Sequence, residues 1–92
     1  MQNIATETGK VSVAAMCYFN MQNYKTALVY FNKALALKTS TNGKSEFFKG
    51  VSLMNLGKNE EGCETMKISK AKGYKEKEAE MNNILKTRCG VQ

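Results

Sequence analysis

The chain contains no proline, no tryptophan, no histidine and no aspartate. The lack of proline, together with only seven glycines in 92 residues, favours an all-α chain with short turns. The lack of histidine removes the commonest general base and metal ligand. The sequence also offers no nucleophile with a nearby base. We therefore expect a protein that is not an enzyme and that uses no cofactor.

The positive charge comes almost entirely from lysine, because arginine is nearly absent. The net charge is +6, yet only Arg88 among the fourteen cations is an arginine. Nucleic-acid readers usually rely on arginine to grip phosphates and guanine edges, so we do not expect nucleic acid as the partner. A solvated lysine-rich surface is the simpler interpretation.

Long apolar runs are missing as well. None approaches the ~18 residues that a membrane span needs, so we expect no membrane span. The N-terminus has neither the basic start nor the apolar core of a signal peptide. We expect a cytoplasmic location by default, or a periplasmic one if a signal peptide has been removed.

What the chain does contain is an internal repeat. Residues of matching size recur 35 positions apart: Ala15 and Gly50, Tyr18 and Leu53, Ala27 and Gly62. A fixed period near this value is typical of stacked helical repeats. Small residues suit places where helices cross closely. The alternative is a chance amphipathic bundle of five helices.

Helical spacing of apolar residues predicts five helices. The first begins between residues 4 and 10 and ends near 21, and the others span about 24–38, 45–56, 59–72 and 75–88. Ser45 and Asn59 are the expected N-caps of the third and fourth helices, and residues 39–43 are an expected loop.

The repeat resembles the tetratricopeptide repeat family. Repeat one, about residues 8–41, matches its pattern at Ala15, Tyr18, Tyr24, Ala27, Phe31 and Ala34. Repeat two, about residues 43–76, matches it at Gly50, Leu53, Gly57, Gly62 and Met66. Gln22 and Thr39 depart from the family's glycine and proline in repeat one. Asn59 and Ser69 replace tyrosine and alanine in repeat two.

The tail adds a second resemblance. Gly62-Cys63, Lys72-Gly73-Tyr74-Lys75 and Cys89 are similar to the C-terminal ends of short tetratricopeptide proteins from the Bacteroidetes. Together the resemblances imply a single domain over residues 1–92. Two helix-turn-helix repeats and a capping helix, about residues 75–89, would form a right-handed superhelical α-α solenoid.

The family's concave groove gives the candidate site. Carried onto this chain, its lining residues are Ser12, Met16, Phe19, Asn20, Lys44, Phe47, Val51, Met54 and Asn55. The function implied is non-catalytic protein–protein interaction, with a peptide or helix of a partner protein in the groove. Ser12 and Met16 stand where some members carry a lysine and an asparagine that grip a C-terminal carboxylate. Chaperone tails are therefore not expected partners.

Three alternatives remain open from the sequence. Phe47 and Met54 could simply be core residues between the repeats. The chain could be a self-assembling module, a homo-oligomer formed through the same face or the N-terminal edge. It could also bind acidic chains, nucleic acid included, through charge alone.

The three cysteines, Cys17, Cys63 and Cys89, form no Cys-x-x-Cys pair, so we expect no zinc site or other metal site. Cys17 is expected to be a small core or half-buried residue. Across the turn at Gly73, matching depth places Cys63 nearer Ile84 than Cys89. A disulfide between Cys63 and Cys89 and a pair of reduced thiols are both kept as alternatives.

Overall fold

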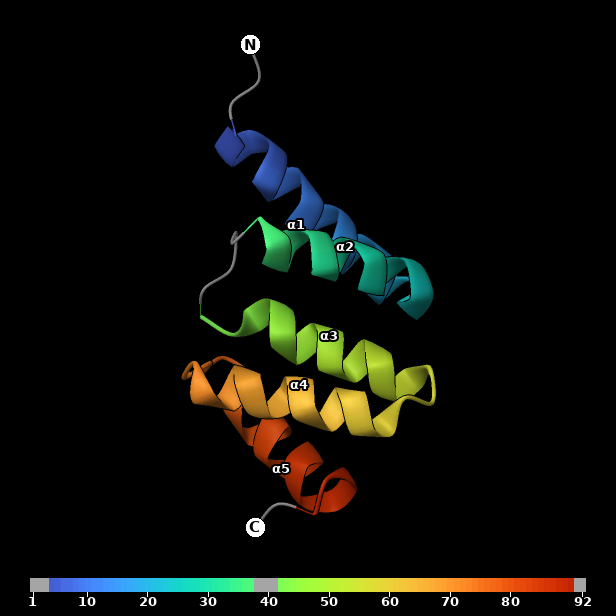
Figure 1. The fold of residues 1–92 in the computed structure, drawn as a ribbon, viewed down its shortest axis with the longest axis vertical. Helices are drawn as coiled ribbons and strands as arrows, with labels where there is room; N and C mark the ends of the chain where they lie inside the picture. The colour runs from blue at the N-terminus through green and yellow to red at the C-terminus, as the bar shows by residue number, and fades with distance from the viewer. Residues whose placement is uncertain (1–3, 38–41, 91–92) are drawn as a thin grey trace.

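The computed structural model describes residues 4–37 and 42–90, with side chains from residue 10 onward. Within these ranges the chain forms five α-helices and no strand, which confirms the all-α prediction. The helices are α1 (Ile4–Asn20), α2 (Tyr24–Ala36), α3 (Lys44–Asn55), α4 (Asn59–Ala71) and α5 (Glu78–Arg88). They are stacked in chain order along the long axis, with the two termini at opposite ends (Figure 1). No helix in the described part of the chain has the length and apolar character needed to cross a membrane.

Short turns join the helices into two antiparallel pairs, α1 with α2 and α3 with α4 (Figure 1). The first turn places Gln22 at φ +62°, and the second places Gly57 at φ +83°. Both residues therefore adopt the left-handed conformation, and they stand 35 positions apart. Glycine adopts this conformation without penalty, whereas a residue with a side chain loses about 1–2 kcal/mol.

The second pair is held together by two glycines that let the helix backbones touch. A Cβ added to Gly62 would lie 2.9 Å from the carbonyl oxygen of Gly50 and 2.7 Å from Met54 Cγ. A Cβ added to Gly50 would lie 3.0 Å from the carbonyl oxygen of Gly62. The prediction that these small residues mark a close crossing is confirmed.

The core runs through the whole stack. Ala15 of α1 and Ala27 and Ala34 of α2 are fully buried, and Phe31 of α2 is 2% exposed. Met66 lies buried on α4, and Met81 and Leu85 are the two buried residues of α5. The core therefore reaches the last helix, whose remaining surface is largely polar.

Two of the expected helix caps are wrong. Gly43, at φ +92°, caps α3, and Ser45 lies buried inside the helix. The Asn42 side chain accepts a hydrogen bond from the Lys44 backbone N–H at 3.1 Å instead. The N-cap of α4 is Lys58, and Asn59 is the first residue of the helix, with its side-chain amide donating to the Arg88 carbonyl. Residues 38–41, which include the expected end of the second helix and most of the expected loop, lie outside the described residues.

The last helix begins three residues later than expected, at Glu78. A turn precedes it, in which the Glu78 N–H donates to the Lys75 carbonyl at 3.1 Å. Because α5 starts later than expected, Cys89 lies beside Cys63 of α4, where Ile84 was expected. The two cysteines form a disulfide with a Cα–Cα distance of 5.6 Å. The Asn59 amide donates to the Arg88 carbonyl at 3.2 Å beside it. Cys17 is a free thiol and is exposed, contrary to the expectation of a buried or half-buried residue.

Candidate functional site

Two adjoining hollows lie along α1, α3 and α5, and we call them together the groove. The first section, of about 560 Å³, lies between α1 and the start of α3, with Phe31 of α2 at its floor. The second section, of about 400 Å³, lies among the end of α1, the middle of α3 and α5. Phe48 lines both sections, so its ring is a wall that the two hollows share.

Helix α1 supplies one wall through a regular spacing. Ser12, Met16 and Asn20 are four residues apart, and side chains at this spacing lie above one another on one helix face. Val13 and Cys17 follow the same spacing one position further round the helix, and all five line the first section. The wall is therefore mixed, with apolar and polar side chains in alternate positions.

The start of α3 is fixed by a contact with α4. Ser69 Oγ donates a hydrogen bond to the Gly43 carbonyl at 2.7 Å, and both residues are buried. No side chain fits at Gly43, since an added Cβ would lie 2.7 Å from the carbonyl oxygen of Ser69. This contact sets where Lys44, the next residue, stands at the edge of the first section.

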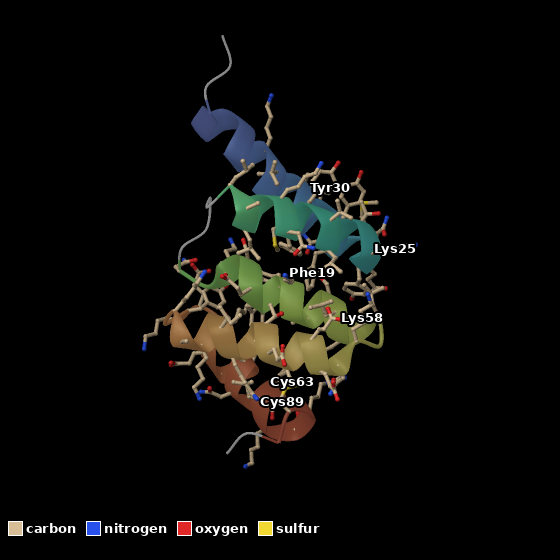
Figure 2. The ribbon with its side chains drawn as sticks, viewed as in Figure 1. Phe19, Lys25, Tyr30, Lys58, Cys63 and Cys89 are labelled. Atoms are coloured by element: carbon tan, nitrogen blue, oxygen red, sulfur yellow. A yellow bond between two sulfur atoms is a disulfide. The ribbon has the colours of Figure 1, made fainter. Side chains whose placement is uncertain are left out.

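Phe48 is placed by a cluster of aromatic rings. Phe19 of α1 and Phe47 meet it edge to face, each with ring centroids 5.0 Å apart, and Phe31 stacks on it at 6.3 Å. Figure 2 shows Phe19 between the first helix pair and α3. Interlocked rings of this kind hold one another's orientation, so the junction of the two sections is a packed surface.

Helix α5 and the residue before it close the second section: Lys77, the N-cap, and Glu80, Asn83 and Ile84 of the helix. Lys77 and Glu80 form an ion pair at 3.7 Å, so this wall carries little net charge. The helix is held to α4 by the burial of Met81 and Leu85 and by the disulfide, which Figure 2 shows between the two chain segments.

Two titratable side chains next to the groove residues, Glu46 and Tyr74, are buried. Glu46 is 4% exposed and forms an ion pair with Lys72, while its Oε1 atom has no hydrogen-bond partner among the described residues. Tyr74, whose ring contacts Phe47 at 5.6 Å, is buried as well. Burial raises the pKa of the Tyr74 hydroxyl above its ordinary value, and the charges of Glu76 and Glu80 raise it further.

The predicted groove residues divide into three groups. Ser12, Met16, Asn20 and Lys44 line the first section, and Phe19, Phe47 and Val51 line the second. Phe47 is nevertheless 3% exposed, so most of its ring belongs to the core. Met54 and Asn55 line neither section. Met54 is buried against Gly62, and the Asn55 amide donates to the Val51 carbonyl at 2.9 Å.

Several lining residues were not expected from the sequence. Phe48 is the most important, and its only signal was its place beside Phe47. The α5 residues were missed because their position depends on the late start of that helix. Val13, Cys17, Phe31, Asn42 and Ser45 also line the first section.

Comparison with protein-family models, with curated proteins and with solved structures finds no match to this chain. Among the described residues, no three His, Cys, Asp or Glu side chains stand close enough together to hold a metal ion. The site is therefore characterised by its shape and lining. It is a groove of two neighbouring sections with mixed apolar and polar walls, and the two sections share an aromatic side chain, Phe48.

Proposed function

We propose that this chain is a short solenoid of two tetratricopeptide-like repeats with α5 as its cap, wound as a right-handed superhelix. Equivalent positions, 35 residues apart, support the repeat because they are buried alike. Ala15 and Gly50, Ala27 and Gly62, Phe31 and Met66, and Ala34 and Ser69 are all buried pairs. The left-handed residues Gln22 and Gly57 keep the same offset at the turns.

We further propose that the protein acts without catalysis, by binding a peptide or helix of a partner protein in the groove. The observation that carries this proposal is that two hollows lie next to each other and share Phe48 in their walls. A concave, mostly apolar surface with a few polar groups is the usual form of a peptide-binding site. Methionine at position 16 adds an adaptable contact, because its side chain is unbranched and flexible.

The first test is selection of binders from a displayed library of random 12-residue peptides. Selected peptides are then measured by fluorescence anisotropy against Val13→Glu, which places a charge in the first section at a side chain that is 63% exposed. The matched control is Val29→Glu on α2, where the native side chain is 50% exposed and lines neither section.

We expect Val13→Glu to weaken binding at least tenfold and Val29→Glu to leave it within about twofold. Both variants carry the same charge change on an exposed helix position, so net charge cannot explain a difference. Circular dichroism and thermal melting establish that each variant is folded. Equal affinity for the two variants, or no selected peptide, would refute the groove as the binding site.

Self-association is the second candidate function, and exposed apolar side chains favour it. Among the six large ones in the described part of the chain, Val13, Met21, Val29 and Leu37 belong to the first helix pair or its turns. Sedimentation velocity over a hundredfold range of concentration tests it. A dimer that dissociates on Val29→Glu would support self-association through this end, and a monomer throughout would refute it.

A further inference from the structure

The described side chains of α1, α2 and α3 carry accessible charge of one sign. The single carboxylate among them is Glu46, which is buried and neutralised by Lys72. The cations are Lys10, Lys25, Lys33, Lys44 and Lys49, and four of the five are exposed. The described side chains therefore give this part of the chain a positive surface, and Lys44 brings that charge to the first section. The side chain of Glu7 on α1 lies outside the described ones. A surface of one sign attracts partners of the other sign and steers them to it.

The two sections differ in what they would accept. Among the described residues that line the first section, Lys44 alone is charged, and the apolar side chains of Val13, Met16 and Phe48 line the same section. An anionic group beside Lys44 would be partly shielded from water by these side chains, which strengthens the attraction between the charges. The second section is lined mainly by Phe19, Phe47, Phe48, Val51 and Ile84, and its two charged residues pair with each other.

We propose that the occupant of the groove is an acidic protein segment that also carries an apolar side chain. A carboxylate of the segment lies beside Lys44, and the apolar side chain lies against Phe19, Val51 and Ile84. This inference rests on the proposed function and adds the chemistry of the partner. A nucleic acid fits less well, because Arg88, the chain's one arginine, lines neither section.

The composition of the selected peptides tests the inference. We expect the peptides enriched from the random library to contain more Asp and Glu than the input, together with Leu, Ile, Val or Phe. One enriched peptide is then synthesised in three forms: unchanged, with every acidic residue replaced by its amide, and with every large apolar residue replaced by serine. We expect each substituted form to bind at least tenfold more weakly than the unchanged form.

A pair of charge variants locates the contact. Lys44→Glu removes the cation that lines the first section, and Lys25→Glu makes the same charge change on an exposed residue of α2 that lines neither section. We expect Lys44→Glu to weaken binding of the unchanged peptide at least tenfold and Lys25→Glu to weaken it less than threefold. Binding of the amide form should change little with Lys44→Glu. Both variants are first shown to be folded by circular dichroism.

The outcomes separate the two proposals. Peptides that lose affinity with Val13→Glu but bind equally well as amides would refute the acidic partner and leave the groove function standing. Equal losses with Lys44→Glu and Lys25→Glu would show that net charge alone is recognised, which also refutes the inference. A 12-residue oligothymidylate that binds more tightly than the acidic peptide, and loses affinity with Lys44→Glu, would assign the site to nucleic acid instead.

Discussion

The disulfide between Cys63 and Cys89 joins the second turn of α4 to the residue that caps the end of α5. Because α5 buries only Met81 and Leu85, the bridge holds a helix whose apolar contact with the rest of the chain is small. The same helix forms one wall of the groove through Ile84 and Asn83. The bridge therefore supports both the stability of the chain and the shape of the second section.

Removing this bridge should lower the free energy of unfolding by about 2–4 kcal/mol, as expected for a cross-link between cysteines 26 positions apart. Urea unfolding compares two proteins that both carry Cys17→Ser, one with the disulfide intact and one with Cys63→Ser and Cys89→Ser added. We also expect amide exchange over residues 78–89 to speed up more than exchange in α1 and α2. Three free thiols in the untreated, denatured native chain, instead of one, would contradict the structure.

The turn at Gln22 holds a side chain in the left-handed conformation that glycine favours, at φ +62°. Gln22→Gly should raise the free energy of unfolding by about 0.5–1 kcal/mol, because relief of the backbone penalty exceeds the added freedom of the unfolded chain. Gly57→Ala, in the equivalent turn, should lower it by about 1 kcal/mol. Chemical unfolding measures both, and changes of the same sign would contradict this account.

The contact of α3 with α4 depends on Gly62, where an added Cβ would lie 2.9 Å from the Gly50 carbonyl oxygen. Gly62→Ala should destabilise the protein by about 1–3 kcal/mol, although alanine is the better helix former by about 1 kcal/mol. Lys67→Ala, on an exposed position of the same helix, is the control and should change stability by less than about 0.5 kcal/mol. A rise in melting temperature for Gly62→Ala would show that the helices have room to separate.

The ion pair of Glu46 and Lys72 links the start of α3 to the end of α4. Lys72→Ala would leave the buried carboxylate without a counter-charge. We expect a loss of about 2–3 kcal/mol, below the range for fully buried pairs because the Lys72 side chain is 37% exposed. Lys70→Ala, an exposed cation in the same turn, should cost less than about 0.5 kcal/mol. Equal losses for the two variants, measured by denaturant unfolding, would refute the pairing.

The buried Tyr74 should make the stability of the protein depend on pH in the alkaline range. Since its pKa in the folded protein is raised above the ordinary value of 10.0, the folded state retains this proton at pH values where the unfolded state loses it. The contribution to stability is complete below pH 10 and is lost as the pH rises through the folded pKa. The native chain should therefore lose stability above pH 10 more steeply than Tyr74→Phe. Parallel stability curves for the two proteins would contradict the burial of this hydroxyl.

Much of the fold followed from the sequence because it depends on local spacing. Apolar periodicity and the glycines at 57 and 73 placed the helices of both pairs to within a few residues. The small residues Gly50 and Gly62 marked the close crossing, since size is read directly from the residue type. Part of the groove followed for the same reason: Ser12, Met16 and Asn20 are four residues apart and therefore share a face of an α-helix.

The errors arose where a side chain has several partners to choose from. Ser45 and Asn59 are good capping residues, but Ser45 is buried within α3 and Asn59 bonds to the end of α5. Phe47 and Phe48 are identical in type, adjacent in sequence and both buried, so nothing local shows that Phe47 lines the second section alone whereas Phe48 lines both. Their rotation is set by Phe19 and Phe31 on other helices and by Tyr74 in the connection between α4 and α5.

The sequence by itself determined that this chain is helical, where most of its helices lie, and that small residues recur at a fixed period, because each of these depends on residues close together in the chain. Only the tertiary structure decided that α5 starts late enough to bring Cys89 to Cys63, that Glu46 is buried against Lys72, and that two neighbouring hollows share Phe48. These features depend on how neighbouring helices are shifted and rotated against one another, and that is fixed by packing between residues distant in the sequence.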